Sequence, residues 1–166
     1  MDSDGLTHLD SAGRARMVDV GDKPATRRTA MASGHLRMNP DTRQRVLAGE
    51  TPKGGVVEVA RIAGIQAAKR TSELIPMCHP LPLARVDVEI EAADDGIRVC
   101  TTATTTGSTG VEMEALTGTS VALLTLYDMC KALQRDMRID SVTLESKSGG
   151  RSGDWTRDAT ARGKSG

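Results

Sequence analysis

The chain has 166 residues, with 22 acidic and 22 basic side chains, which suits one domain and gives no overall field for DNA or an anionic membrane. It has no Phe, one Tyr and one Trp, so it lacks the aromatic platforms on which single-stranded nucleic acids stack. Three scattered cysteines without a Cys-x-x-Cys pair, and the lack of an apolar signal or membrane-spanning run, favour a protein of the reducing cytoplasm that binds neither nucleic acid nor membrane.

The predicted elements alternate between strands and helices within 17–147. A flexible arm over 1–16 and a Gly/Ser/Arg-rich tail over 148–166 flank this single domain, in which every candidate catalytic residue lies. In chain order the elements are a strand over 27–38, a short helix capped by Asn39 and ending near Leu47, a helix over 56–74, strands over 83–92 and 97–106 joined by a turn, a long apolar helix over 110–135, and a strand over 139–145. This order predicts an α+β fold, a ferredoxin-like antiparallel sheet with helices packed on one face.

A stiff loop over 75–82 carries the first candidate site. Three prolines exclude a helix there and hold Cys78 and His79 on a non-helical segment, where they have little conformational entropy to lose on binding. The same pattern also fits a proline-rich turn with a buried cysteine and an incidental histidine. A metal site at Cys78 and His79 is disfavoured because no paired-ligand spacing is present.

Two carboxylates, Glu112 and Glu114, flank Met113 where the chain enters the long helix. In an extended segment they would share one face and form an acidic pair. In a helix they diverge, and acidic groups in the first turn simply complement the helix dipole.

Asp128 and Lys131 lie three residues apart on the long helix, so their side chains are neighbours. This helix is apolar around much of its circumference, which predicts that it is buried or lies at a subunit contact. A charged pair on a buried helix is costly unless it is paired or functional, and such a pair can serve as an acid and a base. The alternative is an exposed ion pair of little energetic weight.

Basic residues beside glycines give a further set of candidates for binding an anion, because glycines let backbone N–H groups approach it closely. They include Lys53, Lys69 and Lys147. Composition alone favours a flexible tail with solvated charges for residues 148–166, after Lys147.

Seven stretches of the chain together resemble one family. They are 6–8, 17–20, 60–71, 74–81, 110–117, 127–132 and 147–154. In this order they are similar to the cyclic pyranopterin monophosphate synthases, the accessory protein C family of molybdenum cofactor biosynthesis. The resemblance implies conversion of (8S)-3′,8-cyclo-7,8-dihydroguanosine 5′-triphosphate, a cyclised dihydro-GTP supplied by an upstream radical enzyme, to the cyclic phosphate of a pterin with release of pyrophosphate. It implies a homohexamer, a trimer of dimers, with active sites at subunit contacts and no cofactor, a requirement for Mg²⁺ being left open.

The resemblance also assigns residues. It implies that Asp128 is the active-site aspartate, that Lys53 and Lys131 act in catalysis, and that substrate is bound by Met77, Cys78, His79, Glu112, Met113, Glu114, Arg28, Lys69 and Lys147. Asp128 and Lys131 fit proton transfers of opposite sense during ring opening and closure. The leaving pyrophosphate needs positive charge nearby, which is the charge that Lys53, His79 and neighbouring basic groups are expected to supply. The alternative function is a non-catalytic, oligomeric nucleotide-sensing module.

Overall fold

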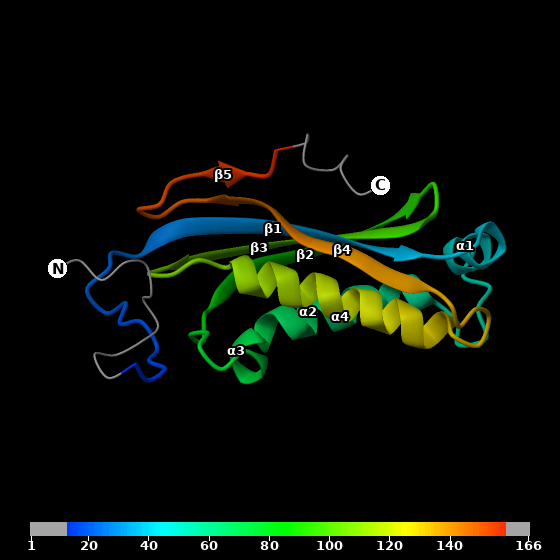
Figure 1. The fold of residues 1–166 in the computed structure, drawn as a ribbon, viewed down its shortest axis with the longest axis horizontal. Helices are drawn as coiled ribbons and strands as arrows, with labels where there is room; N and C mark the ends of the chain where they lie inside the picture. Colours follow the sequence, from blue (N-terminus) through cyan, green and yellow to red (C-terminus); the bar gives the residue numbers. More distant parts are fainter. Residues whose placement is uncertain (1–12, 159–166) are drawn as a thin grey trace.

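An antiparallel sheet of five strands carries the fold in the computed structural model, which describes residues 13–158 (Figure 1). The strands are β1 (Thr26–Arg37), β2 (Leu83–Ala93), β3 (Gly96–Gly107), β4 (Arg138–Ser148) and β5 (Trp155–Thr156). Their order in the sheet is β2-β3-β1-β4-β5, and every neighbouring pair is antiparallel. The first four strands therefore have the ferredoxin-like order.

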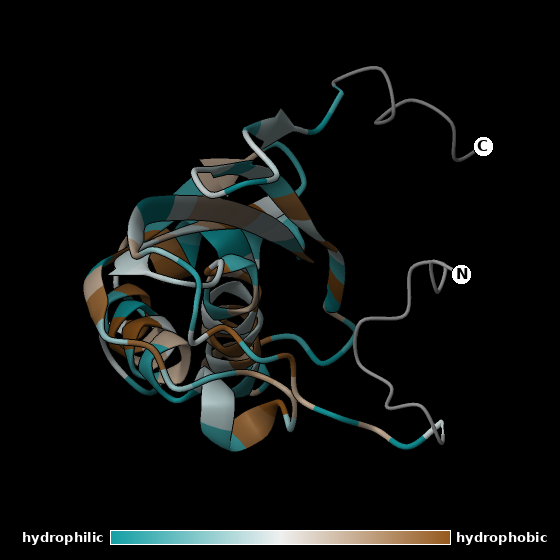
Figure 2. Cartoon of the chain, turned by 90° about the vertical axis from the view of Figure 1, so that its left-hand side faces the viewer, coloured by the Kyte–Doolittle hydropathy of each residue, from teal (hydrophilic) through white to brown (hydrophobic). Residues whose placement is uncertain are grey.

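The helices form a second layer against one face of the sheet. They are α1 (Pro40–Leu47), α2 (Val56–Lys69), α3 (Thr71–Leu74) and α4 (Glu112–Cys130). The helices α2 and α4 run side by side along the sheet, and α1 lies at the end of the molecule where β1 ends (Figure 1). Figure 2 shows the helix layer on one side of the sheet. The predicted α+β, ferredoxin-like class is confirmed.

Small side chains on the inner face of the sheet let the helices pack closely against it. Along β1, Ala30, Ala32, Gly34 and Leu36 alternate toward the helices and are all buried. The largest fully buried side chains include Leu36, Ile97, Leu123 and Leu126, from β1, β3 and α4. Each such side chain contributes roughly 1.5–3 kcal/mol through its removal from water. The core therefore lies between the sheet and α4.

The backbones of α2 and α4 touch at two glycines. A Cβ atom at Gly118 would lie 2.9 Å from Thr101 Cγ2 and 3.1 Å from the Gly64 carbonyl oxygen. A Cβ atom at Gly64 would lie 3.0 Å from the Gly118 carbonyl oxygen. There is no room for a side chain at this crossing, so α4 is held against both the sheet and α2.

Two predicted helices end earlier than the sequence suggested. The helix expected over 56–74 is interrupted at Arg70, because the Thr71 hydroxyl donates a hydrogen bond to the Ala68 carbonyl, 2.9 Å away, and competes with the helical pattern. The helix expected over 110–135 ends at Cys130. There the Tyr127 hydroxyl donates to the Arg135 carbonyl at 2.7 Å and fixes the turn that leads into β4.

The helical spacing of Val59 and Ile62 predicts a buried apolar stripe on α2, and the structure differs from it. Val59 and Ile62 keep 46% and 55% of their surface exposed, and the buried face is made instead by smaller residues such as Ala60 and Gly64. The boundaries of arm, domain and tail stay predictions. In the structure β4 runs to Ser148 and β5 pairs with it, and residues 1–12 and 159–166 lie outside the described part. None of the helices in the described part is long and apolar enough to cross a membrane.

The glycine crossing gives a test of this packing. Replacing Gly118→Val would force the side chain into Thr101 and the α2 backbone, and should lower the free energy of unfolding by about 1–3 kcal/mol. Urea denaturation followed by circular dichroism measures the change. The matched control is Gln66→Val on the exposed side of α2, for which a change below about 0.5 kcal/mol is expected. Equal stability of Gly118→Val and the wild type would contradict the close packing.

Candidate active site

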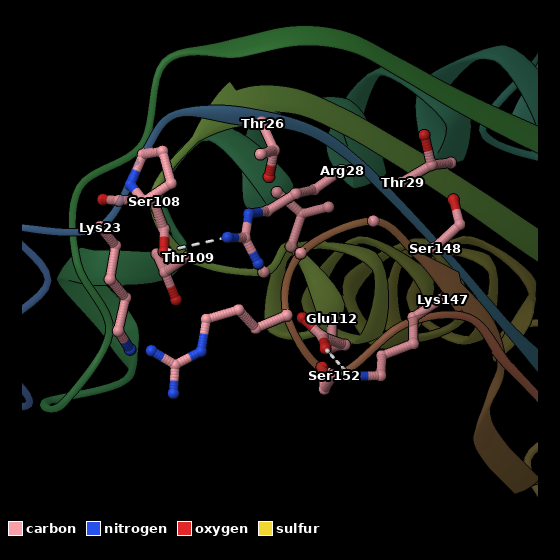
Figure 3. Close-up of a pocket in the computed structure, with 16 residues that line it drawn as sticks. Lys23, Thr26, Arg28, Thr29, Ser108, Thr109, Glu112, Lys147, Ser148 and Ser152 are labelled. Carbon is pink, nitrogen blue, oxygen red and sulfur yellow. Dashed lines mark hydrogen bonds and ion pairs between the residues drawn. The ribbon is translucent and has the colours of Figure 1, made fainter.

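Two adjoining cavities lie at the end of the molecule where α4 begins. The first, here the basic cavity, has a volume of about 550 Å³ and lies between the start of β1, the loop after β3 and the loop after β4 (Figure 3). The second, here the loop cavity, has a volume of about 480 Å³ and is lined by the 75–81 loop, the N-terminal segment and the first turn of α4. Together they are large enough for a nucleotide-sized ligand.

Arg28 is fixed inside the basic cavity by backbone carbonyls. Its Nε donates to the Gly107 carbonyl at 3.0 Å and its Nη2 to the Ser108 carbonyl at 3.2 Å. Gly150 has φ +80° and lies against the guanidinium, where a Cβ atom would overlap it. The glycine-rich loop after β4 therefore packs on Arg28 and forms a wall of the cavity.

Lys147 and Glu112 lie next to each other on one side of the same cavity (Figure 3). Their Nζ and Oε1 atoms are 3.7 Å apart, and Lys147 also donates a hydrogen bond to the Ser152 hydroxyl at 2.6 Å. Lys147 lies in β4 and not in a tail, so its position is set by the sheet. The ammonium is thus held by groups of the chain itself.

The loop cavity gathers the residues of the proline-rich loop and of the first turn of α4. Met77, Cys78, His79, Met113 and Glu114 all line it. The loop is anchored by a hydrogen bond from the Cys78 N–H to the Ile75 carbonyl at 3.0 Å. This cavity is mainly apolar, with a few polar groups converging on it.

Glu114 is the most unusual of these groups because its carboxyl is buried. The residue is 4% exposed, and burial raises its pKa, with the nearby Glu112 acting in the same direction. Burial and the Glu114 charge also raise the pKa of the Cys78 thiol, so this cysteine is a neutral side chain at neutral pH and not a thiolate nucleophile. Both acidic residues lie in the first turn of α4, so they diverge as the helical interpretation predicts.

Asp128 forms a separate cluster with two lysines at the other end of α4. Its Oδ1 lies 2.6 Å from Lys131 Nζ and its Oδ2 lies 2.9 Å from Lys53 Nζ. Hydrogen bonds from Lys131 and then Lys53, with their charges, lower the pKa of Asp128 to about 2. All three side chains are about half exposed, at 55%, 53% and 45%, so the single chain does not bury the pair.

The structure therefore divides eleven of the twelve predicted site residues into two sets. Eight lie at the cavities: Arg28, Lys147, Glu112, Met77, Cys78, His79, Met113 and Glu114. Asp128, Lys131 and Lys53 lie at the far end, about 24 Å along α4 from Glu112 at 1.5 Å per residue. Lys69 ends α2, is exposed, and lines neither cavity.

Sequence reasoning missed one basic residue that lines both cavities, Lys23, and it gave no separate role to Arg151, which lines the basic cavity. Lys23 lies in an irregular segment whose periodicity gives no signal, although it closely follows the 17–20 stretch. Arg151 lies in the glycine-flanked basic stretch that begins at Lys147. Among the described residues, no group of three or more His, Cys, Asp or Glu side chains is placed to hold a metal ion.

Comparison with known sequences shows the family of the chain. Residues 17–150 match the model of the MoaC family. The chain is 57% identical to the cyclic pyranopterin monophosphate synthase of Roseiflexus sp. (strain RS-1), over 92% of this chain and 98% of that protein. It is 54% identical to the protein of that name from Chloroflexus aggregans, over 95% of this chain and 97% of the relative. The chain belongs to the MoaC family.

The lysine pair around Asp128 gives a prediction about its titration. Removing either ammonium, in Lys131→Met or Lys53→Met, should raise the pKa of Asp128 from about 2 toward its ordinary value of 3.8, because the ionised form loses a partner. The larger rise is expected for Lys131→Met. Carboxyl-detected NMR titration measures it, with Lys69→Met as the control. An unchanged Asp128 pKa in Lys131→Met would show that the contact does not form in solution.

Proposed function

We propose that this chain converts the cyclised dihydro-GTP to cyclic pyranopterin monophosphate and releases pyrophosphate, in the cytoplasm. Membership of the MoaC family supports the activity, and the pair of adjoining cavities is the observation that carries the assignment to this site. A basic cavity next to an apolar cavity with a buried carboxyl matches a ligand with a triphosphate at one end and a purine-derived ring at the other. The three cysteines are free thiols, which agrees with a reducing compartment.

The basic cavity is proposed to hold the triphosphate. Arg28 and Lys147 are fixed there before substrate arrives, so they present positive charge without reorganisation. In the phosphate step a substrate hydroxyl oxygen forms a bond to the α-phosphorus, and the bond from that phosphorus to the bridging oxygen breaks. The pyrophosphate leaves with the electron pair, and the proton of the hydroxyl goes to a base. Fixed cations stabilise the charge that develops on the leaving group.

The loop cavity is proposed to hold the ring. Its apolar walls include Met77 and Met113, and its buried carboxyl, Glu114, lacks a partner from another described side chain. A purine-derived ring offers N–H donors to such a carboxyl, which would relieve the cost of its burial. His79 lies on the wall of the same cavity and is available to contact the substrate.

The catalytic trio of Asp128, Lys131 and Lys53 is proposed to reach this site from a second copy of the chain. One stripe of α4 runs at helical spacing from Met113 through Leu116, Ser120 and Leu124 to Asp128, and its residues are exposed or half-buried. If two copies of α4 pack antiparallel about a two-fold axis near Ser120, residue 128 of one copy lies opposite residue 112 of the other. This pairing brings each trio to the cavities of its partner.

An exposed apolar patch supports the same contact. It consists of Val59 and Ile62 on α2 and Leu124 on α4, which are 46%, 55% and 58% exposed. These side chains lie on the helix layer that the sheet does not cover, and a second copy would remove them from water. Asp128, Lys131 and Lys53 lie beside this patch, so the same contact would partly bury their charges. A partly buried position is expected for charged groups that act in catalysis. The hexamer implied by the family resemblance would contain three such dimers.

A purified assay tests the activity and the roles of the trio. Wild-type chain mixed with the cyclised dihydro-GTP should release pyrophosphate, whereas a nucleotide-sensing module would bind without release. Asp128→Asn and Lys131→Ala should each lower the turnover by about 100-fold or more, because each removes a proton-transferring group. The control is Asp41→Asn, an exposed carboxylate in the first turn of α1. Near wild-type turnover of either variant would overturn its assigned role.

Mixing two inactive variants tests whether the site is shared between copies. Asp128→Asn has an intact cavity and His79→Ala has an intact trio, so hybrids formed after unfolding and refolding them together should regain about a quarter of wild-type activity. The controls are the two variants refolded separately, which should stay inactive. A mixture that stays inactive, although native mass spectrometry shows mixed oligomers, would place the whole site within one copy.

A further inference from the structure

Lys23 occupies the boundary between the two cavities. Four residues line both of them: Lys23, Thr109, Gly110 and Glu112. Among these four Lys23 is the only basic one, and Figure 3 shows its side chain on the opposite side of the basic cavity from Lys147 and Ser152. Any ligand that extends from one cavity into the other must pass this boundary.

The ammonium of Lys23 differs from the cationic groups of Arg28 and Lys147 because the described part of the chain does not engage it. Arg28 is bound to two carbonyls and Lys147 to Ser152 and Glu112. No hydrogen bond or ion pair joins the Lys23 side chain to another described residue. All three of its N–H donors are therefore free for a ligand.

The backbone of Lys23 is nevertheless held. Its N–H donates to the Val20 carbonyl at 3.2 Å, and the Gly21 N–H donates to Asp19 Oδ1 at 2.9 Å, so residues 19–23 form a closed turn. Pro24 follows and restricts Lys23 to extended conformations. The segment thus positions the Cα atom of Lys23 and leaves the long side chain to reach the boundary.

Glu112 on the same boundary is already paired with a cation. Its carboxylate lies 3.7 Å from the Lys147 ammonium, and Figure 3 shows these two side chains on the same side of the basic cavity, opposite Lys23. Because Lys147 offsets the Glu112 charge, Lys23 is the boundary residue whose positive charge is left for a phosphate.

We infer that Lys23 binds the α-phosphate, an inference that rests on the proposed function. In the substrate, the α-phosphate joins the ring system to the terminal phosphates, so it lies where the two cavities meet. The α-phosphorus gains the bond to the attacking hydroxyl oxygen and loses the bond to the leaving pyrophosphate, and it stays in the product. Lys23 neutralises charge on its non-bridging oxygens and gives up no proton. Arg151, which lines the basic cavity alone, faces only the departing phosphates.

This assignment predicts that Lys23→Met changes the binding of one product, cyclic pyranopterin monophosphate, much more than the binding of the other product, pyrophosphate. By isothermal calorimetry, Lys23→Met should weaken binding of cyclic pyranopterin monophosphate by about 10-fold or more, as loss of a charged hydrogen bond does, and change binding of inorganic pyrophosphate by less than about 3-fold. Arg151→Met should do the reverse. Lys23→Met should also lower kcat for pyrophosphate release, with Lys23→Arg recovering much of it. Arg16→Met, an exposed position on the same segment that lines neither cavity, is the control.

The outcomes separate the inference from the function on which it rests. Wild-type binding of the cyclic product by Lys23→Met, or an equal loss of affinity for the product and for pyrophosphate, would overturn the inference and leave the function standing. A wild-type chain that released no pyrophosphate from the cyclised substrate would overturn the proposed function, and the inference with it. Thermal unfolding of each variant shows whether the fold is intact, and Lys23→Arg gives a second measurement if Lys23→Met does not fold.

Discussion

The close packing of α4 against the sheet and α2 is the constraint on which the rest of the structure depends. Gly64 and Gly118 let the two helix backbones touch, and Leu123 and Leu126 fill the space above the sheet. A helix held in this way is a rigid rod of 19 residues, with the cavities at its first turn and Asp128 near its last. Because the rod cannot shorten, one chain cannot bring these two groups of residues together.

This separation explains why the two ends are built differently. At the cavities, Arg28 and Lys147 are fixed by the chain itself, which is an arrangement prepared for an anionic ligand. At the far end, two lysines hold Asp128 ionised on an exposed surface beside the apolar Leu124. Each end is incomplete in a different sense: the first lacks a proton-transferring pair, and the second lacks a cavity. The antiparallel pairing of two α4 helices proposed above would supply what each end lacks through one contact.

Much of the fold could be predicted from local signals. The Asn39 cap, whose side chain accepts a hydrogen bond from the Thr42 N–H at 2.7 Å, and the alternation of β2 are properties of neighbouring residues. The break at Arg70 could not be predicted, because it depends on the Thr71 hydroxyl bonding to the Ala68 carbonyl. The exposure of Val59 could not be predicted either, because it depends on which face of α2 packs against Gly118 of α4. The proline-rich loop, the two carboxylates of α4 and Lys147 were candidates from their local sequence, and the family resemblance assigned them to substrate binding. Lys23 was missed, since an unpartnered lysine in an irregular segment has no pattern of its own.

The most direct test of the shared site joins the two ends chemically. Cys78 lines the loop cavity, so in a Cys100→Ser, Cys130→Ala background the change Asp128→Cys gives one thiol at each end. Within one chain the ends are separated by about 24 Å of helix, too far for a short bis-maleimide. The account predicts covalently linked dimers on a denaturing gel, which disappear when Asp128→Cys is omitted. Monomers alone, from a protein that reacts fully with the reagent, would contradict it.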